Sequence, residues 1–217
     1  MQRILSVLEH YTPDVILLQE VAQGIPRLGR IDQVAALKKA TGLHSAFHPE
    51  HQFRRGGYGN LILSRFPLRD TRHIDLTVGW RKRRGALLSH IDVASSRGTL
   101  RVQIGNLHLG LAGSERAIQL QRLLETSAIR RDHSQASVLG GDLNDLWGTL
   151  GPRFLQPAGY QRMGRLQHTF PAALPLRPLD GLFCRGPLHP KRCRAGGTRD
   201  ARQASDHLLL FADLDCG

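Results

Sequence analysis

Nearly unbroken apolar runs recur along the chain, and they restrict it to folds in which a β-sheet is covered by other layers. A strand that is apolar at consecutive positions is buried on both faces, because its side chains alternate between the two sides of the sheet. The sequence predicts strands over residues 14–19, 60–64, 86–93, 100–107, 136–139, 179–184 and 207–214. Segments with helical spacing stand between several of these runs. The alternation predicts an α/β sandwich.

Three segments carry apolar residues at helical spacing. They cover residues 2–11, Ile31–Ala40, for which Gly42 is the predicted stop, and Ser114–Arg131, for which Ser114 is the predicted N-cap. The intervening stretches rich in His, Arg, Gly and Pro are predicted as irregular, at residues 43–59 and 148–176. No internal repeat and no long linker divides the sequence, so a single domain over residues 1–217 is expected.

Targeting signals are not visible in the sequence. No run approaches the ~18–20 apolar residues that a membrane span needs, and charges stand at the N-terminus where a signal peptide has its apolar run. Cys184, Cys193 and Cys216 are odd in number and lack metal-site spacing, which is typical of a reducing compartment. A cytoplasmic location is therefore expected.

The charge balance favours a phosphate-rich partner. The 30 basic residues against 18 acidic ones leave a net charge of +12, and most of the basic residues are arginine, whose planar fork suits phosphate oxygens. Nucleic acid, an anionic lipid surface or a phosphorylated small molecule would fit. The alternative, a GC-rich genome that inflates arginine content, stays open. Residues 81–84 (RKRR) are the best candidate for a phosphate-binding loop, with a solvated basic turn as the alternative.

Polar side chains recur at the ends of the predicted strands. Strand ends on one edge of a sheet converge in space, so these residues are expected to line one cleft. Each of them alone would be an ordinary turn or cap residue. They are Glu20, Asn106, His108, Asp142, Asn144, Asp180, Asp206 and His207.

Six motifs that contain these residues resemble a known family in their order. They are LLQEV (17–21), GYGNLILSRFPL (57–68), NLHLGL (106–111), LGGDLND (139–145), PLDGLF (178–183) and SDH (205–207). The pattern is similar to that of the endonuclease/exonuclease/phosphatase superfamily, which contains DNase I, AP endonucleases, neutral sphingomyelinases and inositol polyphosphate 5-phosphatases. The resemblance implies a DNase I-like, four-layered α/β sandwich of two mostly antiparallel β-sheets flanked by helices.

The resemblance also implies a role for each carboxylate and amide of the cleft. Glu20 and Asp206 would be ligands of a divalent metal, and an all-oxygen site suits Mg²⁺, with Mn²⁺ as a second candidate. Asp142 would be the general base for the attacking water. Asn144 would donate to a phosphoryl oxygen.

The histidines take the remaining roles that the resemblance implies. His207 would stabilise the transition state or protonate the leaving group, and Asp180 would orient its ring. His108 would be a second imidazole facing the phosphate, with a packed structural histidine as the alternative. Asn106 is expected to be structural, and Asn60 and Tyr58 are expected to steady the site.

Two features depart from the family pattern. Family members carry an earlier strand, with an Asn that reaches the metal or the phosphate, ahead of the helix that here begins at Gln2. The chain is therefore expected to be N-terminally truncated, because loss of a core strand would leave a sheet edge and an apolar face uncovered. The family also often has Arg at the position of Pro178 and a larger residue at Gly181, which puts a substrate contact in doubt unless Arg177 replaces it.

The leading interpretation is a Mg²⁺-dependent phosphodiesterase that acts on nucleic acid. One alternative, which the resemblance leaves open, is cleavage of a lipid head-group or inositol phosphate ester. Aromatic residues are too sparse, at 6%, to indicate base-stacking platforms, so the sequence does not choose between DNA, RNA and lipid phosphate. Another alternative is a non-catalytic binding protein inactivated by the missing strand. A serine hydrolase is disfavoured because no G-x-S-x-G motif is present. No protein partner is predicted.

Overall fold

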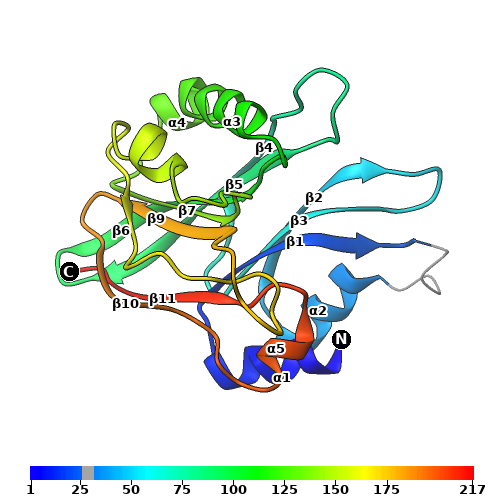
Figure 1. Ribbon diagram of the computed structural model, residues 1–217. Helices are drawn as coiled ribbons and strands as arrows, with labels where there is room; N and C mark the ends of the chain where they lie inside the picture. The colour runs from blue at the N-terminus through cyan, green and yellow to red at the C-terminus, as the bar shows by residue number, and fades with distance from the viewer. Residues whose placement is uncertain (26–31) are drawn as a thin grey trace.

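The computed structural model describes residues 1–25 and 32–217, and its largest element is a six-stranded sheet (Figure 1). The strand order is β4-β5-β6-β7-β9-β8, and every neighbouring pair is antiparallel except β6 and β7. These strands are β4 (Arg69–Asp75), β5 (Gly85–Ser95), β6 (Gly98–His108), β7 (Ala136–Asp142), β8 (Gln161–Arg162) and β9 (Asp180–Arg185).

A second layer of strands faces this sheet in two separate pieces. A three-stranded antiparallel sheet has the order β1-β3-β2, and a two-stranded ribbon pairs β10 with β11. Apolar side chains from both layers pack between them, among them Ile62, Ile91 and Ile104. The strands are β1 (Val15–Gln23), β2 (His44–Gln52), β3 (Gly57–Ser64), β10 (His189–Ala195) and β11 (Leu210–Asp215).

Helices cover the two outer faces. α3 (Gly113–Glu125), α4 (Ser127–Arg130) and the single turn η2 (Gly151–Leu155) pack on the six-stranded sheet. α1 (Gln2–Tyr11) and α2 (Gln33–Thr41) pack on the three-stranded sheet, and the short α5 (Ala201–Ala204) lies against α1. None of the described helices has the length and apolar character to cross a bilayer. The four layers confirm the predicted α/β sandwich (Figure 1).

Two local predictions are wrong. The segment predicted as a loop over residues 43–59 forms β2 and the start of β3, because pairing with β3 stabilises a strand that is mostly His, Pro and Gln. The helix predicted over 114–131 breaks at Thr126, whose backbone is extended, and its N-cap is Ala112 instead of Ser114. In the helix predicted from Ile31, that residue lies outside the described residues, and α2 starts after the N-cap Asp32.

One row of paired residues crosses the central sheet at a single edge. Gly85 pairs with His108, His108 with Asp142, and Asp142 with Asp180. Four strands thus begin or end on the same row. Three of the predicted site residues are neighbours because of strand register alone.

A gap separates the three-stranded sheet from the ribbon. In the described part of the chain, β1 pairs only with β3 and β11 pairs only with β10, so each presents one unpaired edge. A cavity of about 1320 Å³ runs between the two edges, and it is lined by apolar residues such as Leu17, Ile104 and Phe211. The same cavity extends to the row of site residues.

Candidate active site

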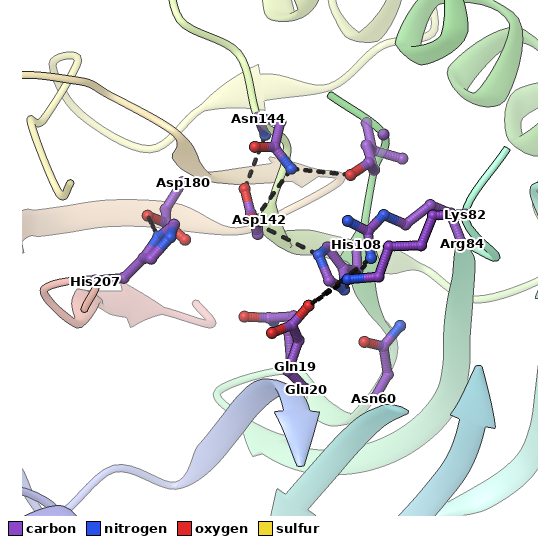
Figure 2. A network of polar contacts seen from close by, with 12 residues as sticks. Gln19, Glu20, Asn60, Lys82, Arg84, His108, Asp142, Asn144, Asp180 and His207 are labelled. Carbon is purple, nitrogen blue, oxygen red and sulfur yellow. Dashed lines mark hydrogen bonds and ion pairs between the residues drawn. The ribbon is translucent and has the colours of Figure 1, made fainter. Parts of the chain in front are cut away.

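The structure brings the predicted site residues together in one cavity. The seven that were assigned catalytic or metal roles all line it. They come from β1, the ends of β6 and β7, the turn after β7, the start of β9 and the segment before β11. Figure 2 shows Asp142 in the centre, the Asp180 and His207 pair on one side, and His108, Glu20 and Lys82 on the other. The residues are Glu20, His108, Asp142, Asn144, Asp180, Asp206 and His207.

Asp142 is held by the turn that follows β7. Its Oδ1 accepts a hydrogen bond from the Asn144 backbone N–H at 2.9 Å, and the Asn144 side-chain amide donates to Oδ2 at 3.3 Å and to the Leu109 carbonyl at 2.9 Å. Gly141 precedes it at φ 131°, where a Cβ would lie 2.1 Å from the Leu107 carbonyl oxygen. Only glycine permits this approach, so the Gly-Gly pair before Asp142 sets the carboxylate's position.

The carboxylate of Asp142 has a raised proton affinity. Burial raises its pKa, and the charge of Asp180 raises it further, while the nearby His108 and the Asn144 N–H oppose this shift. A general base works best when its pKa approaches the operating pH. The environment therefore shifts Asp142 toward the expected function, and the neighbouring carboxylate contributes to that shift.

Asp180 and His207 form a carboxylate–imidazole pair. His207 Nδ1 lies 2.8 Å from Asp180 Oδ2, which also accepts a hydrogen bond from the Thr169 hydroxyl. The Phe170 ring packs against His207 with 4.9 Å between ring centroids. Because Nδ1 is engaged by Asp180, Nε2 is the ring nitrogen left for a substrate.

The charge state of His207 follows from its carboxylate neighbours. Burial alone would lower its pKa, but the hydrogen bond and charge of Asp180, together with the charges of Asp142 and Asp206, raise the pKa to about 9. The imidazole is therefore protonated at neutral pH. A protonated Nε2 can donate to a phosphoryl or leaving-group oxygen.

His108 has two buried partners: Glu50, which sequence reasoning missed, and Arg84, which belongs to the predicted basic segment 81–84. Its Nδ1 lies 3.3 Å from Glu50 Oε2 and 3.4 Å from Arg84 Nη1, and its Nε2 lies 3.7 Å from Asp142 Oδ2. Asn60 donates to the other Glu50 oxygen at 2.9 Å. Glu50 lies in β2, inside the segment predicted as a loop, so no strand-end pattern marked it.

Glu20 lies at an irregular position within β1. Its φ of 54° is in the left-handed region, and the pairing of β1 with β3 shifts register between Leu18 and Val21. Such a conformation is costly for a residue other than glycine and is often found at functional positions. Lys82 Nζ lies 3.1 Å from the Glu20 carboxylate and 5.5 Å from the centre of the Tyr58 ring.

The proton affinity of Glu20 follows from this cation. Burial raises its pKa, but the hydrogen bond and charge of Lys82, with smaller contributions from His108 and Arg84, leave the pKa below its ordinary value. The carboxylate is therefore ionised at neutral pH. An ionised carboxylate is what a divalent cation requires.

Asp206 is exposed and lies next to His207. Its Oδ1 accepts a hydrogen bond from Ser205, and its carbonyl accepts one from the Ala172 N–H at 2.7 Å. Asn106 is fully buried and donates to the carbonyls of Leu18 and Leu61, which ties the three-stranded sheet to the central sheet.

The donor set fits a hard divalent cation. Among the described residues, ligand atoms of the trio Asp142, Asp180 and His207 lie within 4.8 Å of one another. The two carboxylates of this trio could share an ion, whereas a protonated imidazole could not ligate one. Glu20 and Asp206 are not part of the trio, although both line the same cavity. The predicted site residues thus offer four carboxylates, and oxygen ligands of this kind suit Mg²⁺ or Mn²⁺.

A family model matches this combination of fold and residues. The model of the Endonuclease/Exonuclease/phosphatase family matches residues 1–207. The chain belongs to this family. Membership explains why six motifs far apart in the sequence line one cavity.

Individual relatives support the same assignment. The uncharacterized protein YbhP of Escherichia coli (strain K12) is 29% identical over 175 residues, which is 78% of this chain and 66% of YbhP. An endonuclease/exonuclease/phosphatase from Beutenbergia cavernae superposes with a TM-score of 0.83 at 24% identity, covering 99% of this chain and 66% of that one. D. rerio TDP2, complexed with a single-strand DNA product, superposes with a TM-score of 0.71 at 21% identity, covering 99% and 90%.

The extent of these matches defines what they establish. The two solved structures are under 25% identical and show that the fold is shared. The chain spans 66% of the length of both YbhP and the Beutenbergia protein.

Proposed function

We propose that the chain is a divalent-metal-dependent phosphoesterase that hydrolyses a phosphodiester by in-line attack of water. The observation that carries the proposal is the convergence of Asp142 with two imidazoles, His207 at the Asp180 side and His108 at the Glu50 side. Arg84 and Lys82 line the same cavity. A base, hydrogen-bond donors and cations are the groups that attack on a charged phosphate requires.

Each residue has a distinct part in this scheme. Asp142, with its raised pKa, accepts the proton of the attacking water. Asn144 presents its amide to a phosphoryl oxygen, and the charged His207 donates through Nε2 to the phosphoryl or leaving oxygen. Glu50 acts through His108 and is a positioning residue. Arg84 is buried at 4% exposure and balances charge on the phosphate.

Glu20 and Asp206 are the residues that would hold the metal. A bound Mg²⁺ would supply charge neutralisation at the phosphoryl oxygens. Lys82 occupies the Glu20 carboxylate at 3.1 Å, and this ion pair keeps the carboxylate ionised. Both residues of the pair are about half exposed, so the contact is weak enough to exchange for a divalent ion.

The charge of the chain supports a polyanionic substrate. A net charge of +12, with arginine in excess, favours nucleic acid, and an anionic lipid head group is the second candidate. Arg177 lines the cavity together with Phe170, which supports the proposal that Arg177 replaces the arginine that the family often has at the position of Pro178.

Removal of the metal is expected to abolish turnover. A panel of single-stranded DNA, duplex DNA with and without abasic sites, RNA, sphingomyelin and an activated phosphodiester would be assayed with Mg²⁺, with Mn²⁺ and with EDTA. Activity should appear with the metal, fall by about 10³-fold or more in EDTA, and return when Mg²⁺ is restored, because charge neutralisation at phosphate contributes several kcal/mol. Turnover that persists in EDTA would contradict the metal assignment. No hydrolysis of any substrate in the panel would favour the alternative that the chain is a non-catalytic binding protein.

We also propose that one upstream β-strand fills the gap between β1 and β11, so that residues 1–217 are a truncated form of the domain. The unpaired edges and the apolar cavity of about 1320 Å³ support this. Unpaired strand edges and apolar surface exposed to water both lower the stability of a domain. Protein isolated from its native host should be heavier than 24.1 kDa, and the longer form should melt at a higher temperature. A native mass of 24.1 kDa would contradict the proposal.

A further inference from the structure

Large apolar side chains are exposed on the connections at the active-site end of the central sheet. Trp80 is wholly exposed, and the others are between 41% and 79% exposed. We call these residues the apolar rim. Its members are Trp80, Leu111, Trp147, Leu166, Leu174 and Leu176. Soluble proteins rarely gather exposed apolar residues at one place unless the place is a binding surface.

The topology of the sheet places the rim at the site. Gly85, His108, Asp142 and Asp180 form one row across four strands, and the rim lies on the connections that leave or enter this row. Leu111 follows His108 by three residues and lines the same cavity. The connections are residues 76–84, 109–112, 143–150 and 163–179.

The rim segments are held in fixed conformations. Phe170 and Arg177 form an isolated β-bridge, and the N–H groups of Leu174 and Leu176 donate to the carbonyls of Pro171 and Phe170 at 3.1 and 2.9 Å. The loop that carries Trp80 is closed by a bond from the Leu76 N–H to the Arg84 carbonyl at 2.9 Å.

Cations adjoin the apolar residues. Arg81 follows Trp80, Arg165 precedes Leu166, and Arg177 follows Leu176. All three arginines are solvent-accessible at the surface, and Lys82 and Arg83 extend the first group. Protein surfaces that bind the interface of an anionic bilayer typically combine tryptophan and leucine with arginine and lysine.

We propose that the apolar rim docks the protein on an anionic phospholipid bilayer and places the active site over phosphate head groups. Four of the six rim residues are leucines, which insert among acyl chains but offer no π-face on which a base can stack. Leu174 and Leu176, on the rigid turn beside His207, enter the interface next to the catalytic pair. The identity of the substrate as a lipid phosphate ester rests on the proposed function, whereas the docking does not.

The two tryptophans of the chain make a direct test available. The sequence contains 2 tryptophans, Trp80 and Trp147, and both belong to the rim, so selectively excited tryptophan emission reports on the rim alone. The protein would be titrated with phosphatidylcholine vesicles, with and without phosphatidylglycerol, in EDTA and in an Asp142→Asn background. Binding is thereby separated from catalysis. The anionic vesicles should shift the emission to the blue and sediment the protein.

Matched variants locate the contact. The double variant Leu174→Ser with Leu176→Ser should bind anionic vesicles about tenfold more weakly or worse. Ile118→Ser, an exposed position on α3 outside the rim, should bind like the parent. Both can be checked for folding by circular dichroism, and exposed positions are expected to tolerate serine.

Three outcomes would overturn the proposal. The first is the absence of a blue shift with anionic vesicles while a soluble phosphodiester is still hydrolysed, which would leave the proposed function intact. The second is equal vesicle binding by the double variant and the parent. The third is a loss of affinity for a single-stranded oligonucleotide, instead of vesicles, in the double variant, which would make the rim a nucleic-acid surface.

Discussion

Replacement of Asp142 by asparagine is expected to lower kcat/KM by about 10³-fold, within the range of 10² to 10⁴ that general base catalysis contributes. The substitution removes the proton acceptor but retains the shape of the side chain. The asparagine carbonyl oxygen can still accept the 2.9 Å hydrogen bond from the Asn144 N–H. The turn after β7 should therefore keep its conformation.

The measurement is steady-state hydrolysis of the preferred phosphodiester with Mg²⁺, together with a thermal melt. Most of the loss should be in kcat, because the base acts in the transition state and not in substrate binding. Asp70→Asn is the matched control: it also neutralises an aspartate, but Asp70 pairs with Arg101 on the surface of β4 and β6. If both variants retain parental rates, Asp142 is not the base.

Replacement of His207 by alanine is expected to cost about 10²- to 10⁴-fold in kcat, because the charged imidazole stabilises the transition state or protonates the leaving oxygen. Asp180→Asn should cost less, since its carboxylate acts through His207 at 2.8 Å. The double variant should be no slower than His207→Ala alone, because the two residues form one unit. Multiplicative losses would show that they act independently.

The leaving group separates the two roles of His207. With a nitrophenolate leaving group, which departs without a proton, the cost of His207→Ala should shrink if His207 is the acid. With an alkyl leaving group, which must be protonated as it departs, His207→Ala should cost the whole 10²- to 10⁴-fold. An equal loss on both substrates would assign His207 to the phosphoryl oxygens instead. Kinetics on the two substrates, in parallel with Asp180→Asn, provide the comparison.

The buried strands and the polar residues at their ends could be predicted from the sequence for one physical reason. Strands such as β3, β5 and β6 are apolar at most positions, since they are covered on both faces, and this burial is visible in composition alone. The polar residues that end them interrupt the apolar pattern and therefore stand out. Asp142, Asn144 and His108 were found in this way, and the order of the motifs identified the family.

Strands that are stabilised mainly by pairing with a neighbouring strand could not be predicted from the sequence. β4 and β10 are exposed and polar, and β2 contains four residues of His or Pro type in nine. Their strand conformation comes from hydrogen bonds to β5, β11 and β3. Propensity is a weak guide where pairing decides the conformation.

The sequence by itself determined which side chains could perform the chemistry, because residue type and strand-end position are local properties. Tertiary structure alone decided how they combine. Glu50 meets His108 at 3.3 Å across 58 positions of sequence only because the three-stranded sheet packs on the central sheet. Arg84 joins them because β5 begins beside the end of β6. The open edge beside β1 and the apolar rim are likewise products of topology. Spacing along a chain carries no information on distance between remote segments, and packing supplies it.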